Sequence, residues 1–162
     1  MTQLAIYPGS FDPITLGHLS VLQRAAKVFE SVELLIVHNP SKAPTFSLAQ
    51  RVELAKASLA EVGAPSNIKV STLESGLLVE HTQAFGAKAI IKGFRTASDI
   101  EYELPMSQVN RELTGIETMF LAAEAGFGFV SSSLVREIAS LGGDVSGYVT
   151  QAVAKALQGV AR

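Results

Sequence analysis

The chain of 162 residues contains no cysteine, and only 17% of its residues are charged. Without cysteine it can form neither a disulfide framework nor a thiolate metal site. No apolar run approaches the roughly 18 residues that are needed to span a bilayer, so no membrane partner is expected. A net charge of −2 gives no general attraction to nucleic acid. Any phosphate must therefore be bound by a few placed groups.

Three further sequence signals are missing. There is no GxGxxG and no GxxxxGK[ST] loop, so a nucleotide would have to be held by other segments. The histidines, His18, His38 and His81, lack the spacing of metal ligands, and no protein metal site is expected. The first residues, MTQLAIYPGS, lack a basic segment followed by an apolar run. No signal peptide is therefore seen, and the cytoplasm is the expected compartment.

The chain does contain a regular alternation of short apolar runs and helical patterns. The apolar runs lie at residues 4–7, 32–37, 68–73, 88–91 and 117–122. The helical patterns begin near residue 15 and continue at 47–62, 77–85, 97–113, 131–141 and 148–160. This order predicts the α/β class: a single Rossmann-like doubly wound domain over residues 1–162, with a five-stranded parallel sheet and helices on both faces. Pro105 is expected to kink the helix at 97–113 or to mark a boundary in it.

Polar segments follow four of the predicted strands, at residues 9–18, 39–42, 92–95 and 126–133. The carboxyl ends of parallel strands meet at one edge of a sheet, where α/β proteins bind their ligands. We therefore expect the four segments to converge on one ligand site.

The first polar segment has the most specific pattern, GSFDP followed by TLGH, and ends at His18. The histidine falls in the first turn of a helix, where unpaired N–H groups and the helix dipole favour an anion. In isolation it is better explained as an exposed histidine, and only the long surrounding pattern reverses this preference. A capping box would have Glu or Gln at this position. His18 is interpreted instead as a donor to a phosphate oxygen.

These residues resemble the (H/T)xGH signature of a nucleotidyltransferase superfamily, and most closely that of the bacterial phosphopantetheine adenylyltransferases. The resemblance extends from Ala5 to about Tyr148. It implies transfer of AMP from ATP to 4′-phosphopantetheine, which gives dephospho-coenzyme A and pyrophosphate in coenzyme A biosynthesis. It also implies a homohexamer, Mg²⁺ carried on the ATP phosphates, and a continuous helix through Pro105.

The resemblance assigns three groups of residues. His18, Lys42 and Lys92 are implied to be catalytic. The implied ATP-binding residues are Ser10, Phe11, His18, Gly93, Phe94, Arg95, Glu103, Phe127, Gly128, Phe129, Val130, Ser131, Ser132 and Ser133. Those implied to bind the acceptor are Ser10, Lys42, Leu78 and Lys92.

Simpler interpretations of several residues stay open. Lys42 fits a solvated loop lysine, Leu78 fits plain helix core, and the three serines at 131–133 fit an N-cap region. Two other functions also stay open. One is adenylyl or cytidylyl transfer to another phosphorylated acceptor, and the other is a non-catalytic nucleotide-binding regulatory subunit. An intact His18 disfavours the second.

Overall fold

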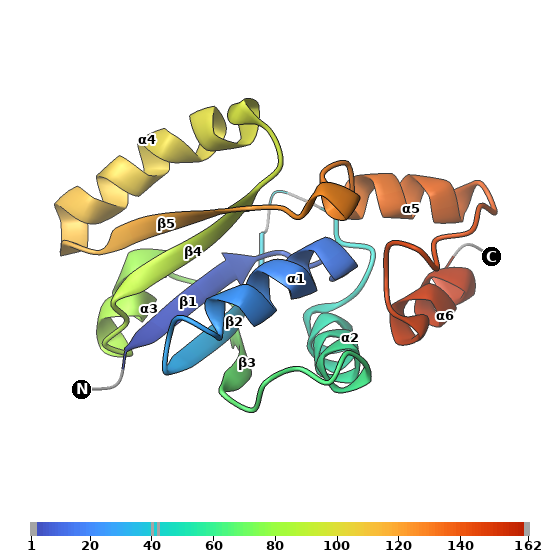
Figure 1. Ribbon diagram of the computed structural model, residues 1–162, viewed down its shortest axis with the longest axis horizontal. Helices are drawn as coiled ribbons and strands as arrows, with labels where there is room; N and C mark the ends of the chain where they lie inside the picture. The colour runs from blue at the N-terminus through green and yellow to red at the C-terminus, as the bar shows by residue number, and fades with distance from the viewer. Residues whose placement is uncertain (1–2, 40, 42, 161–162) are drawn as a thin grey trace.

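The computed structural model describes residues 3–39, 41 and 43–160. Its centre is a five-stranded, all-parallel sheet with the strand order β3-β2-β1-β4-β5 (Figure 1). The strands are β1 Leu4–Gly9, β2 Ser31–Val37, β3 Ile68–Leu73, β4 Ala89–Phe94 and β5 Glu117–Ala122. The predicted fold class is confirmed.

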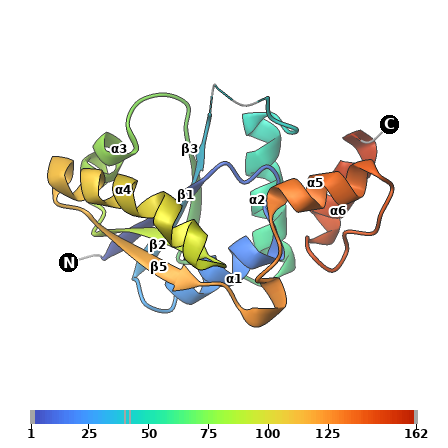
Figure 2. The same cartoon turned by 90° about the horizontal axis from the view of Figure 1, so that it is seen from above.

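Helices cover both faces of the sheet. They are α1 Leu16–Ala25, α2 Leu48–Glu61, α3 Leu78–Ala84, α4 Ala97–Thr114, α5 Ser132–Ser140 and α6 Gln151–Val160, with a 3₁₀ turn η1 at Ala125–Phe127. One face carries α1 and α2, and the other carries α3 and α4 (Figure 2). The last two helices, α5 and α6, pack together, and α6 also packs against α2. None of the helices within the described ranges is both long and apolar enough to cross a bilayer.

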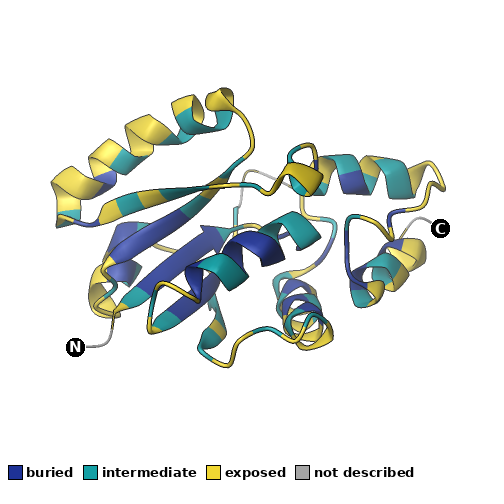
Figure 3. Ribbon diagram, in the orientation of Figure 1, coloured by how far each residue is buried: buried dark blue, intermediate teal, exposed yellow. Residues whose placement is uncertain are grey.

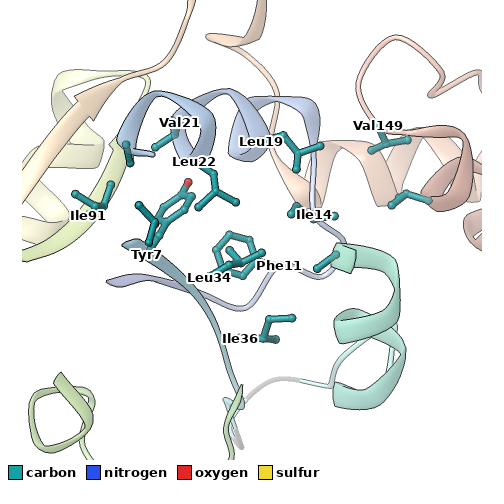
Figure 4. Packing of buried hydrophobic residues seen from close by; sticks show 14 of the residues in the cluster. Tyr7, Phe11, Ile14, Leu19, Val21, Leu22, Leu34, Ile36, Ile91 and Val149 are labelled. Carbon is teal, nitrogen blue, oxygen red and sulfur yellow. The ribbon is translucent and has the colours of Figure 1, made fainter. Parts of the chain in front are cut away.

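The core lies where the three central strands meet the inner surface of α1 (Figure 3). Ile6, Leu34 and Ile90 are fully buried because a parallel strand in the middle of a sheet is covered on both sides. Leu34 belongs to the core cluster on the α1 side of the sheet, where Leu19 and Leu22 of α1 pack above the ring of Phe11 (Figure 4). The result is a rigid base for the segments that follow β1 and β4.

The sheet changes direction between β1 and β4. The chain proceeds from β1 outward to β3 on one side and from β4 to β5 on the other. Pairing between β1 and β4 is limited to Ala5 with Ala89 and Ile6 with Ile90, although both strands continue beyond it. Such a switch point leaves an opening at the carboxyl ends of the two strands, where ligands of α/β proteins bind.

Several predicted boundaries differ from those in the structure. Pro8 and Gly9 were expected to end the first strand, but they belong to β1, which by then pairs with β2 alone. A strand with one free edge tolerates a proline. Helix α4 continues through Pro105, so the proline marks no boundary and the continuous helix implied by the resemblance is confirmed. Glu101, whose carbonyl loses its helical partner there, is exposed to water.

The C-terminal helix was predicted at 148–160, but α6 begins only at Gln151. The Glu61 carboxylate of α2 accepts hydrogen bonds from the N–H groups of Gln151, at 2.8 Å, and Ala152, at 3.4 Å. Tyr148 instead lies in the loop before α6, where its carbonyl accepts a hydrogen bond from the N–H of Leu16, at 2.8 Å. The start of α6 is thus set by contacts from distant segments.

Candidate active site

A pocket of about 650 Å³ opens at the switch point. Its walls are the loop after β1, the first turn of α1, the end of β4, the start of α4 and the start of α5. All four polar segments contribute to it, as the sequence predicted.

Most of the predicted site residues line this pocket. They are Ser10, Phe11, His18, Lys92, Gly93, Phe94, Arg95, Glu103, Phe127, Val130, Ser131, Ser132 and Ser133. Gly128, Phe129 and Leu78 do not. The Phe129 ring lies edge-on against Tyr148, and Leu78 begins α3 on another part of the sheet. Lys42 lies outside the described residues.

The ring of Phe11 is part of the core. The residue has a φ of +45° and is 4% exposed, and its ring stands edge-on to Tyr7, with centroids 5.3 Å apart. A Cβ at Gly9 would lie 2.9 Å from this ring, so only glycine leaves room for it. The expected nucleotide contact of Phe11 can therefore involve little of its side chain. The ring instead supports His18, whose centroid is 5.1 Å away at an angle of 84°.

His18 closes a capping box at the start of α1. The Thr15 hydroxyl accepts a hydrogen bond from the His18 backbone N–H at 3.3 Å, and the Thr15 N–H donates to Nδ1 of the imidazole at 3.1 Å. We expected the histidine to stand in place of a capping box, and this was wrong. The imidazole occupies the position of the usual Glu or Gln side chain, because Nδ1 accepts a hydrogen bond as a carboxylate oxygen does.

The imidazole of His18 is neutral at pH 7. Burial lowers the pKa of His18 from 6.5 to about 4, and the positive charge of Arg95 contributes to this shift. Its hydrogen bonds within the described part of the chain go to Thr15 alone, so no carboxylate orients it as in a hydrolytic triad.

Two basic residues at the end of β4 are paired with acids of α4. Lys92 Nζ lies 3.0 Å from a Glu103 carboxylate oxygen, and Arg95 Nη2 lies 3.2 Å from Asp99. Burial alone would raise the pKa of Asp99, but hydrogen bonds and the charge from Arg95 hold it below its usual value. Both cations face the pocket with a counter-ion that an incoming phosphate can replace.

Gly93 lies between these two cations and brings β4 close to β1 and α1. A Cβ at Gly93 would stand 3.2 Å from Val21 and 3.3 Å from the Tyr7 hydroxyl. This packing places Lys92 and Arg95 opposite the first turn of α1.

The three serines before α5 make different contacts. The Ser131 hydroxyl caps the helix by accepting from the N–H of Leu134, at 3.1 Å. The Ser132 hydroxyl donates to the carbonyl of Pro13 at 2.7 Å, and that of Ser133 accepts from Arg136 at 3.3 Å. The hydroxyls are thus largely engaged within the protein. The backbone N–H groups of Ser132 and Ser133 have no partner in the part of the chain described, so they are better placed to receive an anion.

Sequence reasoning missed two arginines that hold the pocket loops. Arg51 is 2% exposed and donates to the carbonyls of Ser10, at 2.7 Å, and Val37, at 3.3 Å. Arg136 donates to the carbonyl of Asp12. A signal for Arg51 existed, since it is one turn from Leu48 and Ala55 on the apolar face of its helix. Arg136 left no comparable pattern.

The pocket therefore combines two helix N-termini, several cations and a neutral imidazole that holds one free nitrogen. Such a set is suited to binding a polyphosphate and stabilising negative charge that develops on it. Among the described residues that line it, no nucleophile is arranged beside a base. The geometry favours transfer of a phosphate-containing group between two ligands over hydrolysis by a covalent intermediate.

Comparison with known proteins agrees with this chemistry. Residues 6–138 match the Cytidylyltransferase-like family. A phosphopantetheine adenylyltransferase of Corynebacterium glutamicum is 49% identical over 154 residues, which cover 94% of each chain. That of Clavibacter michiganensis is 45% identical over 157 residues, covering 97% of this chain and 96% of the relative. The solved Plasmodium falciparum nicotinic acid mononucleotide adenylyltransferase in complex with NaAD has the same fold, with a TM-score of 0.76 at 15% identity, covering 98% and 96% of the two chains.

Proposed function

The chain belongs to the phosphopantetheine adenylyltransferase family, and we propose that the pocket at the switch point is where it transfers AMP from ATP to 4′-phosphopantetheine. The products are dephospho-coenzyme A and pyrophosphate. The observation that carries the proposal is the placement of His18. The histidine is held neutral at the N-terminus of α1, in the same pocket as Lys92, Arg95 and the N-terminus of α5.

The mechanism needs little proton transfer. The nucleophile is the phosphate of the acceptor, which is already ionised at neutral pH, so no general base is required. Catalysis then consists of aligning the two phosphates and stabilising charge on the α-phosphate. His18 donates a hydrogen bond to that group, while the N–H groups of Ser132 and Ser133 receive the β- and γ-phosphates.

The acceptor phosphate is assigned to Ser10, Lys42 and Lys92. Ser10 and Lys92 line the pocket on opposite sides of the gap between β1 and β4. Lys92 exchanges Glu103 for the phosphate, because a dianion competes well for the one cation. Lys42 keeps its predicted role: Lys42→Ala should raise KM for phosphopantetheine more than KM for ATP, and the reverse order would mean that the two subsites are exchanged.

Magnesium is proposed to arrive on the ATP phosphates. The acidic side chains that line the pocket, Asp12, Asp99 and Glu103, each have a protein partner already. Mg²⁺ prefers phosphate and water oxygens to a full set of protein ligands. When bound, it would neutralise charge on the pyrophosphate leaving group.

The proposed location is the cytoplasm, because ATP and the acceptor are cytoplasmic metabolites. The proposed assembly is a homohexamer. An apolar stripe on α4 supports self-association. Tyr102, Met106, Val109 and Leu113 follow one another at spacings of four, three and four, and are 83%, 58%, 46% and 61% exposed. Met106→Glu should lower the molar mass in light scattering, and an unchanged mass would exclude this stripe as an interface.

The test is pyrophosphate release by the purified protein with ATP, Mg²⁺ and 4′-phosphopantetheine, beside a control without acceptor. Acceptor-dependent release is expected. Release with nicotinamide mononucleotide, glycerol phosphate or choline phosphate alone would identify another acceptor. Tight ATP binding without turnover on any acceptor would favour the regulatory function.

A further inference from the structure

The role of His18 depends on which imidazole nitrogen carries the proton, and the contacts of Thr15 answer this. The backbone N–H of Thr15 points at Nδ1 of His18 at 3.1 Å. A backbone N–H can only donate, so Nδ1 must present its lone pair. In a neutral imidazole the proton then resides on Nε2.

We infer that Thr15 is a positioning residue that holds His18 as the Nε2–H tautomer, so that a neutral imidazole offers its N–H to the α-phosphate of ATP. The identity of that phosphate rests on the proposed function, but the tautomer does not. The low pKa of His18 is consistent with the neutral ring.

The Thr15 side chain adds a second restraint to the same ring. Its hydroxyl accepts from the His18 N–H and lies 3.1 Å from Nδ1, so it can donate its own proton there. Thr15 is 1% exposed. If the ring turned over, a carbon would face the Thr15 N–H and leave a buried donor without a partner. The edge-on contact with Phe11 also restricts the ring.

This arrangement gives the first residue of the Thr-x-Gly-His pattern a task beyond capping. An ordinary N-cap stabilises its helix and has no effect on chemistry elsewhere. The partner of Thr15 in its capping box is His18, whose side chain is also proposed to bind substrate. The contacts of Thr15 therefore decide which nitrogen of His18 can donate. In serine proteases a carboxylate likewise fixes the tautomer of the catalytic histidine, and its loss lowers the rate.

The direct test is a long-range ¹H–¹⁵N correlation spectrum of the full chain labelled with ¹⁵N-histidine, with His18→Gln for assignment. His38 and His81 serve as internal references. At neutral pH, Nε2 of His18 should show the shift of a protonated nitrogen and Nδ1 that of an unprotonated one. A protonated Nδ1, or averaged shifts like those of free histidine, would overturn the inference. This readout needs no turnover, so it stays valid even if pyrophosphate release fails.

The functional test uses Thr15→Val, which removes the hydroxyl but keeps the backbone N–H and branched side chain. We expect kcat to fall about tenfold and KM for ATP to stay within about twofold, because the ring is then held by one donor instead of two. The ¹⁵N shifts of His18 should move only partway toward a mixture of tautomers, since the backbone N–H of Thr15 still favours the Nε2–H form. Thr15→Ser should restore both kcat and the ¹⁵N shifts of His18. Wild-type kcat in the valine variant, or a lower kcat with unchanged ¹⁵N shifts, would overturn the role of the side chain.

The matched control is the capping box of α2, where Ser47 accepts from the N–H of Gln50 at 3.2 Å and its own N–H donates to the Gln50 side chain at 2.9 Å. Ser47 does not line the pocket. Ser47→Ala should lower the melting temperature without changing kcat or the His18 shifts. If Thr15→Val altered only the melting temperature, as this control does, Thr15 would be an ordinary cap.

Discussion

The two sides of the pocket are built by different kinds of interaction. On the α1 side, His18 and Ser10 are held by hydrogen bonds to backbone groups and by aromatic packing. On the α4 side, Lys92 and Arg95 are held by ion pairs with Glu103 and Asp99. No contact on the α1 side pairs two opposite charges: the neutral ring of His18 meets the Thr15 backbone, and the Arg51 guanidinium donates to the Ser10 carbonyl. The contacts on the α4 side are pairs of opposite, partly exposed charges.

This difference separates positioning from binding. The α1 side is already arranged before a ligand enters, which is what stabilisation of a transition state requires. The α4 side carries cations whose counter-ions can be exchanged, which suits the capture and release of charged substrates. Variants on the α1 side should therefore lower kcat, and variants on the α4 side should change KM.

The largest expected effect is on the α1 side. His18→Ala should lower kcat by about a hundredfold or more, because it removes the donor to the α-phosphate. His18→Gln is the matched variant, since glutamine can close the capping box but offers no imidazole. It should keep the melting temperature and lose kcat to a similar extent. Steady-state kinetics and thermal unfolding check this, and an active glutamine variant would contradict the assignment.

A smaller effect is expected from the first ion pair of the α4 side. Lys92→Met should raise KM for phosphopantetheine about tenfold, because the acceptor phosphate loses a cation, while kcat changes less. Lys92→Arg should recover most of the affinity. The measurement is initial rate against each substrate in turn. A change confined to KM for ATP would place Lys92 in the other subsite.

A still smaller effect on KM is expected from the second ion pair, between Arg95 and Asp99. Asp99→Asn removes the charge that orients Arg95 and should raise KM for ATP about threefold to tenfold. Glu101→Gln on the same helix is the control, because that side chain is exposed and does not line the pocket. Equal effects of both substitutions on KM would show that the change is a general one of charge.

The last expected effect is on stability and its dependence on pH, and it leaves catalysis at neutral pH unchanged. Because the pKa of His18 is lowered to about 4 in the folded protein, the unfolded chain binds the additional proton between pH 6.5 and 4. The contribution of His18 to the free energy of unfolding is therefore complete above pH 6.5. It is lost as the pH falls toward 4, which lowers the free energy of unfolding by a few kcal/mol at most. Urea unfolding of wild type and His18→Gln across this range measures it. Parallel pH profiles of the two proteins would contradict the shift.

Much of the fold could be predicted because its signals are local. Each apolar run of a strand spans only a few residues, and the capping box of α2 joins Ser47 to Gln50, three residues later. The predicted site was also broadly located, since polar segments at the carboxyl ends of parallel strands must converge. Gly128, Phe129 and Leu78 were not brought to the pocket, because which side a loop residue faces depends on its packing.

The sequence by itself determined the strand–helix order, the parallel sheet and the convergence of the four polar segments, since periodicity and turn residues act over short range. Only the tertiary structure decided that the ring of Phe11 supports His18 and that Glu61 caps α6. It also decided the pairing of Lys92 with Glu103, and how the imidazole is turned. These features depend on atoms that meet through packing and burial, and residue order alone does not specify how side chains are oriented when they meet.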